Sequence, residues 1–486
     1  MNRTSLASLP AGVRGPSYDP ATLTTGIVHF GVGNFFRAHE AYYIDKILGE
    51  SGANVWGILG VGLTAGARSE AKAASFTEQD CLYSLTETAA DGASSVSVIG
   101  AMTGYRLAPA DPEAVLDALS SPAVKIVTMT ITEGGYNIDE RDGTFRVDDD
   151  AVKADLASPG TPCTIFGFVA EALRRRRAAG TGPFTVMSCD NLRHNGDVAK
   201  TAFVGFARVL DADLAAWIEQ NVTFPNAMVD RITPTVTPEI AAALNAHSGL
   251  DDAQPLVAET FTQWVVEDRF CAGRPPLENA GVQFVSDVTG YEHVKVRMLN
   301  ASHVLLGFPA LLLGYREVDK ALADDDLRAL IDTFLDRDVI PQIEAPEGVD
   351  LVTYKNTVLE RFSNAAMGDQ LLRVCGDGSS KIQVFWTETM RRSITSGHDL
   401  SRLVFGMAAY LEMLRGVDEN GDRYTPFEPT LDAKMIALAS DDDLSAGLAL
   451  PTFDGWRSLM TPEITEAVVA ARRSIRDKGV RANLPR

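Results

Sequence analysis

Residues 26–43 read GIVHFGVGNFFRAHEAYY, and this stretch decides how the first half of the chain folds. Its first part, Gly26–Val32, is a short β-rich run, and Arg37–Leu48 places apolar residues at helical spacing. Gly31 and Gly33 stand between the two segments, where glycines let the backbone turn sharply and approach a pyrophosphate at a helix N-terminus. An ordinary tight turn also uses such a pair, and Phe36 replaces the usual third glycine. The stretch predicts a strand–turn–helix unit with a candidate dinucleotide site.

Segments with strand and helix character go on alternating after this unit. The helical patterns include Asp111–Ser120 and Ile165–Ala179. The further strand candidates are Val55–Gly62, Val96–Gly100, Val124–Thr132, Phe184–Ser188 and Gly281–Asp287. Strands that alternate with helices are joined by crossover connections into a parallel sheet. We therefore expect an α/β fold with a doubly wound sheet in the N-terminal part.

After about Val288 the pattern becomes almost entirely helical. The helix candidates there are Val294–Leu313, Leu322–Asp336, Tyr354–Val374, Arg402–Leu414 and Pro462–Arg476. This change of pattern predicts two domains, residues 1–287 and residues 288–486, of which the second is mostly α-helical.

The composition narrows the class of protein. The chain has 486 residues and a net charge of −21, from 44 Lys and Arg against 65 Asp and Glu. Nucleic acids and anionic membranes attract basic surfaces, so neither is expected as a partner. Five scattered cysteines without a Cys-x-x-Cys pair indicate free thiols in a reducing compartment and no metal site. The longest apolar run, Val304–Leu313, is shorter than the roughly 20 residues of a membrane span, and residues 1–20 contain no apolar leader. We expect a cytoplasmic monomer.

The tip of the second strand candidate carries no acidic residue, although an NAD-binding domain normally has one there for the adenosine ribose. Val61–Thr64 closes that strand, and Arg68 and Glu70 follow within a few residues. Glu70 would suit the ribose hydroxyl of NAD, whereas Arg68 would suit the 2′-phosphate of NADP. The residues alone leave NAD and NADP both open.

Lys295, Asn300 and His303 form a polar set within a largely apolar helix candidate. At about 100° per residue, Asn300 lies about 140° and His303 about 80° around the helix from Lys295, so the three share one arc. Burial disfavours a charged Lys and lowers its pKa toward the range of a general base, while amide and imidazole groups could hold an alkoxide. The competing interpretation is an amphipathic helix with a solvated polar face.

Other polar residues follow strand candidates or lie in turns, where ligands of parallel sheets bind. Taken singly, each of them could equally belong to an ordinary surface loop. They are Glu133, Asn191, Asp230, Arg373 and Lys381.

Together these motifs resemble the mannitol dehydrogenase family of polyol-specific long-chain dehydrogenases. The matching stretches are HFGVGNFFRAHEAYY (29–43), TITEGGYNID (130–139), FTVMSCDNLRHNG (184–196), FPNAMVDRITP (224–234), the Lys-x4-Asn-x2-His run from Lys295 to His303, and RFSNAAMGDQLLRVCGDGSSK (361–381). The resemblance implies a Rossmann-type N-terminal domain, a mostly helical C-terminal domain and metal-independent chemistry. The implied reaction converts D-mannitol and NAD to D-fructose and NADH.

The resemblance also implies a role for each matching residue. Lys295 would be the general base, Asn191 and Asn300 would stabilise the alkoxide, His303 would orient the substrate, and Glu292 would sit at the mouth of a proton path. Asp230, Arg373 and Lys381 would contact the polyol. The cofactor would be held by Gly31, Val32, Gly33, Asn34, Phe35, Phe36, Arg37 and Glu133.

Some features depart from the family's pattern. Many members have His at the place of Phe36, and an acidic pair after the second strand is missing here, so NADP stays possible. Arg297, inside the helix of Lys295, has no role in this interpretation. D-Arabinitol, D-sorbitol and fructuronate stay open as substrates of the same chemistry. A non-catalytic dinucleotide-binding sensor is the alternative from another class.

Overall fold

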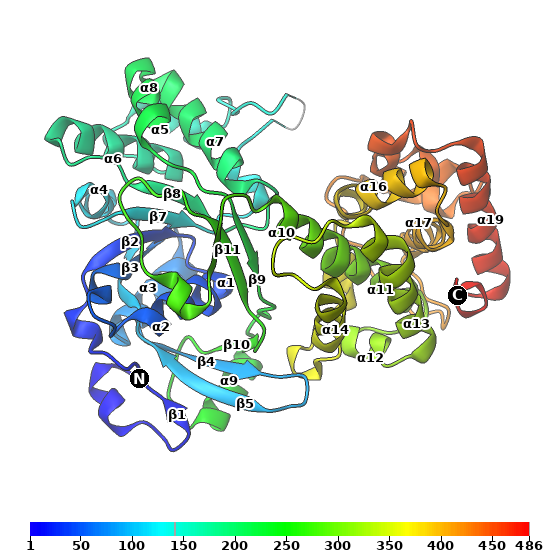
Figure 1. The fold of residues 1–486 in the computed structure, drawn as a ribbon, viewed down its shortest axis with the longest axis horizontal. Coiled ribbons are helices and arrows are strands. Elements are labelled where there is room, and N and C mark those ends of the chain that lie inside the picture. Colours follow the sequence, from blue (N-terminus) through cyan, green and yellow to red (C-terminus); the bar gives the residue numbers. More distant parts are fainter. Residues whose placement is uncertain (140–141, 486) are drawn as a thin grey trace. The chain divides into compact units, whose positions relative to one another are not determined.

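The computed structural model describes residues 1–139 and 142–485, which fold into two compact units (Figure 1). The first unit comprises Met1–Ala89 and Ala93–Thr289, and the second comprises Ala90–Gly92 and Gly290–Arg486. Separate clusters of buried apolar side chains form the interiors of the two units.

A five-stranded parallel sheet organises the first unit. Its strands lie in the order β6 (Met102–Leu107), β3 (Gly57–Gly62), β2 (Thr25–Phe30), β7 (Ile126–Met129) and β8 (Thr185–Ser188). Every neighbouring pair is parallel. Counted along the chain, these strands stand in the order 3-2-1-4-5, which is the order of a Rossmann sheet. The predicted doubly wound fold is confirmed, with β2 at the centre of the sheet.

Helices cover both faces of this sheet, because successive side chains of each strand point to opposite sides. On the face of Ile27 lie α1 (Asn34–Ala38), α2 (Glu40–Ile47) and α3 (Ala67–Glu78). On the face of Val28 and Phe30 lie α4 (Pro112–Ser120), α6 (Ile165–Ala179), α7 (Asn195–Leu210) and α8 (Ala212–Asn221). Figure 1 shows the two groups on either side of the strands. Two further helices of this unit are α5 (Asp150–Ala157) and α9 (Pro238–Ser248).

Two smaller sheets complete the first unit. One has the order β1 (Val13–Arg14), β5 (Ser94–Ile99), β4 (Tyr83–Thr88) and β10 (Leu256–Glu259), and the other β12 (Gln283–Val285), β11 (Gln263–Glu267) and β9 (Ala227–Asp230). The strand predicted at Val96–Gly100 exists as β5, but it pairs antiparallel with β4 instead of joining the parallel sheet. The antiparallel hairpin of β4 and β5 takes the chain away from the parallel sheet. The chain then returns to that sheet as β6 (Met102–Leu107), which pairs with β3.

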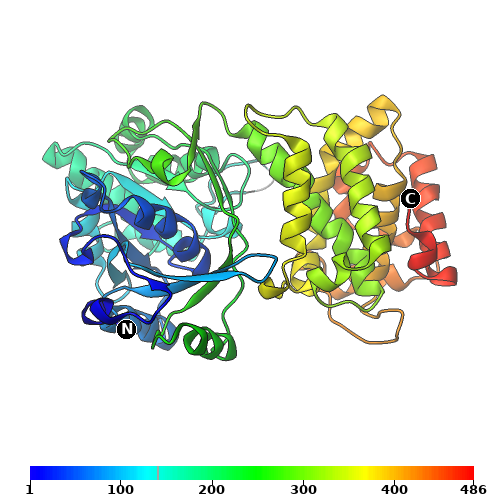
Figure 2. The same ribbon diagram turned by 60° about the horizontal axis from the view of Figure 1, so that its bottom comes forward.

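The second unit is helical (Figure 2). Its helices are α10 (Thr289–Val294), α11 (Ala301–Leu312), α12 (Val318–Leu322), α13 (Asp325–Thr333), α14 (Leu351–Phe362), α15 (Leu371–Cys375), α16 (Gly378–Ser396), α17 (Ser401–Met413), α18 (Ala433–Ala437) and α19 (Pro462–Lys478). α17 packs against both α11 and α19, and nearly all of its residues are buried. None of the helices within residues 1–139 and 142–485 is long and apolar enough to cross a membrane.

The helix predicted at Val294–Leu313 contains an unexpected turn. Lys295–Asn300 is π-helical and joins α10 to α11, and Phe334–Val339 is a second π-helical segment after α13. The single helix predicted at Tyr354–Val374 is wrong, because the chain leaves it at Ser363 and resumes as α15. The side chain of Asn364 caps the short turn between them by accepting a hydrogen bond from the backbone of Ala366.

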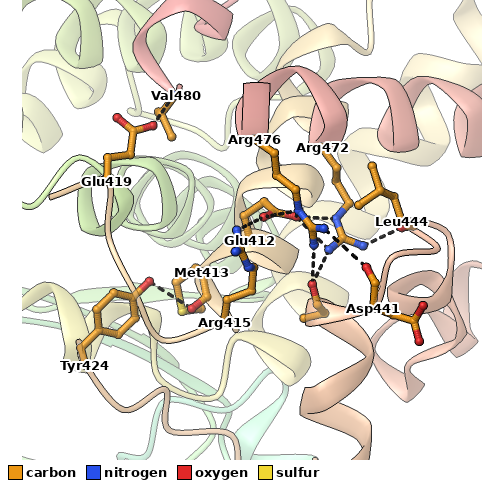
Figure 3. Close-up of polar contacts among 11 residues, drawn as sticks. Glu412, Met413, Arg415, Glu419, Tyr424, Asp441, Leu444, Arg472, Arg476 and Val480 are labelled. Atoms are coloured by element: carbon orange, nitrogen blue, oxygen red, sulfur yellow. Dashed lines mark hydrogen bonds and ion pairs between the residues drawn. The ribbon is translucent and has the colours of Figure 1, made fainter. Parts of the chain in front are cut away.

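The last helix, α19, is anchored to α17 by a buried ion cluster (Figure 3). Glu412 of α17 accepts hydrogen bonds from Arg472 (2.9 Å) and Arg476 (3.0 Å), both on α19. Arg472 also donates to the backbone oxygens of Ala439 (2.7 Å) and Leu444 (2.6 Å). The cluster thus ties the C-terminal helix to the centre of the unit.

Candidate functional site

The glycine turn predicted for a dinucleotide lies at the carboxyl end of β2. Gly31 has a φ of +93°, and a Cβ there would lie only 2.0 Å from the backbone oxygen of Thr130, so a larger residue does not fit. The Thr130 hydroxyl donates to the backbone oxygen of Gly31 at 2.6 Å. A Cβ at Gly33, in contrast, would meet nothing closer than 3.8 Å, so space is open above that residue. A glycine turn with open space, at the start of α1, fits a cofactor diphosphate.

A buried polar network supports this turn from inside the unit. The imidazole Nε2 of His29 lies 3.3 Å from the backbone oxygen of Gly31, and its Nδ1 lies 2.8 Å from the Thr128 hydroxyl and 3.0 Å from the Glu40 carboxylate. Thr128 in turn donates to Glu40 at 2.8 Å. The ring of Phe36 stacks on His29 at 3.6 Å, so its side chain faces the interior. The network fixes the position of the Gly31 carbonyl.

Arg37 and Lys72 hold the outer part of the turn. Arg37 is buried and donates to the backbone of Gly33 (3.3 Å) and to the side chain of Asn34 (2.9 Å). Lys72 of α3 donates to the backbone oxygen of Val32. Burial, together with the nearby guanidinium groups of Arg37 and Arg68, lowers the pKa of Lys72 to about 8. Arg68 and Lys72 are four residues apart on α3, so they lie on one face of that helix.

Asp190 joins the carboxyl ends of two neighbouring strands of the parallel sheet. It follows β8 and accepts hydrogen bonds from the backbone of Ile131 (3.0 Å) and Thr132 (2.9 Å), which follow β7, and from the hydroxyl of Tyr136 (2.7 Å). Burial raises its pKa. These bonds fix the turn that exposes Glu133 and the segment that exposes Asn191. Asp190 lies in the stretch FTVMSCDNLRHNG, whose spacing does not indicate that this residue holds the adjacent loop.

Asp230, like Glu133 and Asn191, is a candidate site residue that belongs to the first unit. It is the last residue of β9, and only 5% of its surface is exposed. In the antiparallel pair of β9 and β11 it stands opposite Gln263. Within residues 1–139 and 142–485, no group of three or more His, Cys, Asp and Glu side chains could hold a metal ion.

In the second unit, Lys295 and Asn300 are the first and last residues of the π-helical turn. The backbone N–H of Ala301 donates to the oxygen of Val296, which is the i→i+5 bond of a π-helix. In an α-helix the angle around the axis between Lys295 and Asn300 would be about 140°. A π-helix has more residues per turn, so this angle is smaller and Asn300 lies more nearly above Lys295. Lys295 and Glu292 are both buried, and Glu292 stands three residues earlier, on α10.

His303 and Arg373 both contact Asp369, a residue that the sequence motif did not single out, and Lys381 acts electrostatically on His303. The Asp369 carboxylate accepts two hydrogen bonds from Arg373 (2.8 and 2.6 Å) and lies 3.6 Å from Nε2 of His303. Phe362 stacks on the His303 ring at 4.4 Å. Lys381 of α16 donates to the backbone oxygen of Val374 (2.9 Å) near the end of α15. The unit thus presents imidazole, guanidinium and ammonium groups together.

His303 gives the protein an acid-sensitive contribution to its stability. Burial lowers the pKa of His303 to about 4, from the ordinary value of 6.5 that applies to the unfolded chain. Between these two values the unfolded chain holds a proton that the folded protein lacks, so unfolding takes up protons and acid favours it. We expect the free energy of unfolding to fall by up to about 3 kcal/mol for this reason as the pH drops from 6.5 to 4.

Urea unfolding of the wild type and of His303→Gln, at pH 7 and at pH 4.5, measures this contribution. Other carboxylates titrate in the same range and act on both proteins alike, so the difference between the two proteins isolates His303. The wild type should lose more stability than the variant on acidification. An equal loss in both would show that His303 is protonated in the folded protein.

Two family models match consecutive parts of the chain. The Mannitol dehydrogenase Rossmann domain matches residues 25–279, and the Mannitol dehydrogenase C-terminal domain matches residues 287–475. A Polyol:NADP oxidoreductase of Gluconobacter oxydans is 60% identical over 485 residues, which is 100% of both chains.

Two solved structures are similar over the whole chain. A D-sorbitol dehydrogenase in substrate-free form has 59% identity and a TM-score of 0.95, with 100% of both chains covered. A Pseudomonas fluorescens mannitol 2-dehydrogenase in ternary complex with NAD and D-mannitol has 43% identity and a TM-score of 0.88, with 100% of this chain and 98% of that chain covered.

Proposed function

The chain belongs to the mannitol dehydrogenase family of polyol oxidoreductases, and from this premise we propose that it oxidises a polyol carbinol to a ketone with Lys295 as the general base. The observation that carries the proposal is the π-helical turn that begins at a buried Lys295 and ends at Asn300. We further propose that residues 1–287 act as the dinucleotide-binding domain and residues 288–486 as the substrate-binding and catalytic domain.

Each candidate residue has a step that its chemistry suits. Lys295 takes the proton of the substrate hydroxyl, and Glu292 passes that proton on toward solvent. The amide groups of Asn191 and Asn300 donate to the developing alkoxide. His303 is neutral at physiological pH, because its pKa is about 4, and it orients the substrate by hydrogen bonding without adding charge. A bound nicotinamide supplies the oxidant, which accepts hydride from the carbinol carbon.

Asp230, Arg373 and Lys381 are proposed to bind the remaining hydroxyl groups of the polyol. A carboxylate accepts hydrogen bonds from hydroxyls, whereas guanidinium and ammonium groups donate to them. Two cations would also suit the carboxylate of a sugar acid such as fructuronate. The names of the relatives favour an uncharged polyol over a sugar acid.

For the substrate we propose D-mannitol, oxidised at C2 to D-fructose, with D-sorbitol as the second candidate. Oxidation of either hexitol at C2 gives the same ketose, because the two differ only in the configuration at that carbon. Cofactor reduction, followed by absorbance with mannitol, sorbitol, arabinitol and xylitol and with NAD or NADP, tests the proposal. Turnover of a hexitol supports it. Nucleotide binding without turnover of any polyol, and without oxidation of NADH or NADPH by fructuronate, would instead favour a non-catalytic sensor.

For the cofactor we propose that the protein accepts NADP as well as NAD. The diphosphate would lie against Gly31, Val32, Gly33 and Asn34, near the backbone of Phe35 and Phe36, with Glu133 at the neighbouring strand end. Arg68 and Lys72 place two cations beside the turn, and β3 ends at Gly62 without a carboxylate before Glu70. The 2′-phosphate of NADP suits such a pair.

Arg68→Ala is expected to lower kcat/KM for NADP by about 10- to 100-fold, because it removes a charge-assisted hydrogen bond to the 2′-phosphate. The value for NAD should change by less than about threefold. Initial rates with a saturating polyol measure both. Glu70→Ala is the matched variant on the same helix: a selective loss of NAD activity there would show that Glu70 binds the ribose of NAD. An unchanged value for NADP in Arg68→Ala would overturn the proposed contact with the 2′-phosphate.

A further inference from the structure

Arg297 lies in the middle of the π-helical turn and is almost entirely buried, with 3% of its surface exposed. Its Nε donates to the hydroxyl of Thr389 on α16 at 3.0 Å. Its NH1 donates to the backbone oxygen of Gln342 at 2.9 Å, and the side-chain oxygen of Gln342 lies 3.5 Å from NH2. The guanidinium therefore links the turn to two other segments of the helical unit.

The charge of Arg297 is balanced in an uncommon way. Within residues 1–139 and 142–485, no carboxylate forms an ion pair with it, although Glu388 acts on it from farther away. Its main acceptor, the Gln342 carbonyl, stands at the end of the helical run that begins with α13 and continues through Phe334–Val339 to Gln342. Carbonyl groups at a helix C-terminus carry partial negative charge and attract cations. Burial nevertheless lowers the pKa of Arg297 to about 10.

The same carbonyl also binds Arg392 of α16, whose NH1 donates to it at 3.0 Å. Arg392 differs from Arg297 in its surroundings, because 45% of its side chain is exposed and it is paired with Glu388. The two arginines thus share an acceptor, but only Arg297 belongs to the π-helical turn. This difference makes Arg392 a matched control for the charge at Gln342.

A π-helical turn needs support from its surroundings, because it contains an extra residue relative to an α-helix and is rare for that reason. Here α16 supplies contacts to the turn itself and to Ala301, the residue that follows it. Thr389 holds Arg297, and the indole N–H of Trp386, three residues earlier, donates to the backbone oxygen of Ala301 at 3.1 Å. Gln342 is in turn fixed to α16 through Ser393 at 2.8 Å.

We propose that Arg297 is a positioning residue that holds the π-helical turn and thereby keeps Asn300 over Lys295. Without the guanidinium anchor, the segment relaxes toward an α-helix. The angle around the helix axis between Lys295 and Asn300 then increases toward the α-helical value of about 140°. The consequence for catalysis rests on the proposed function of Lys295 and Asn300. A displacement of about 1 Å at a reacting group can lower a rate by about 100-fold.

The test compares Arg297→Met, Thr389→Val and Arg392→Met with the wild type. We expect Arg297→Met to lower kcat for polyol oxidation by about 100-fold and Thr389→Val by about tenfold, since Thr389→Val removes only one anchor. The dissociation constant of NADPH or NADH, measured by fluorescence titration, should stay within about twofold, because the glycine turn belongs to the other unit. Arg392→Met should leave kcat within about twofold.

Three results would overturn the proposal. The first is an Arg297→Met protein whose kcat per nucleotide-binding site is unchanged while its melting temperature is lower. This result would indicate a merely structural role. Another is an equal loss in Arg392→Met, which would assign the effect to charge at Gln342. The third is a crystal structure of Arg297→Met that keeps the π-helical turn. Thr389→Val provides the same comparison if Arg297→Met does not fold.

The crystallographic measurement also separates this proposal from the proposed function. Full turnover of Lys295→Ala would refute the role of Lys295 as the base. The conformation of residues 295–300 in Arg297→Met would still decide whether Arg297 holds the turn.

Discussion

Replacement of Lys295 by alanine is expected to lower kcat for polyol oxidation by roughly 10²- to 10⁴-fold, the usual contribution of a positioned general base. The ε-amino group is the acceptor for the hydroxyl proton, and Lys295 is buried, so water does not easily take its place. Steady-state rates between pH 6 and about 10 measure the loss. In the wild type, oxidation should fall toward low pH, because a protonated lysine cannot accept a proton.

Two controls make this result specific to the base. Lys320→Ala removes an exposed lysine of the same unit that is paired with its neighbour Asp319, and it should leave kcat unchanged. A small primary amine added to Lys295→Ala should restore part of the rate, because it supplies the missing proton acceptor. Near-wild-type turnover of Lys295→Ala from neutral to alkaline pH would contradict the assignment.

The parallel sheet could be predicted from the sequence because its strands are local apolar runs, each followed by a helical pattern. β2 and α6 are examples of elements that were predicted in this way. The helix predicted at Ile165–Ala179 has the same bounds as α6. The division of strands among sheets could not be predicted, because it depends on pairing between distant segments. Val96–Gly100 has the same local pattern as a Rossmann strand and yet belongs to a hairpin.

The helical unit shows the same limit at its turns. The start of α16 could not be predicted from the sequence CGDGSS. The first N–H groups of α16 donate hydrogen bonds to Glu428, which lies fifty residues away in the chain. The predicted helix Arg37–Leu48 is interrupted at His39, whose side chain bonds to the backbone of Gln263 on β11. Neither contact leaves a periodic signal in the local sequence.

The candidate site could be predicted as residue types, but its geometry could not. Lys295, Asn300 and His303 stand out as polar residues in an apolar helix, and the spacing fixes their order. The π-helical turn changes the angle between Lys295 and Asn300, and it depends on Arg297 and on partners far away in the chain. Asp369 and Asp190 act through contacts that no spacing rule contains. Sequence reasoning therefore names candidate reacting groups more readily than the residues that hold them.

The anchoring of α19 leads to the largest expected effect on stability. Glu412 and Arg472 are both buried, at 2% and 0% exposure, and Arg415 and Arg476 also contact the Glu412 carboxylate. Burial lowers the pKa of Arg472, and Glu412 opposes this shift. The Glu412 carboxylate thus balances the positive charge of several guanidinium groups, and that of Arg472 is shielded from solvent. Loss of that carboxylate leaves a buried cation uncompensated, which is costlier than loss of one arginine.

Glu412→Gln is therefore expected to lower the free energy of unfolding of the helical unit by about 3–5 kcal/mol. Arg472→Met should cost less, because Glu412 keeps Arg415 and Arg476 as partners. Arg415→Met, which removes a partly exposed arginine from the same carboxylate, should cost less than about 1 kcal/mol. Urea unfolding, combined with hydrogen exchange of the α19 amides, measures the three variants. If Glu412→Gln and Arg415→Met were equally mild, the ion cluster would not be what holds α19, and its apolar contacts with α17 through Val468 and Ile475 would carry the helix instead.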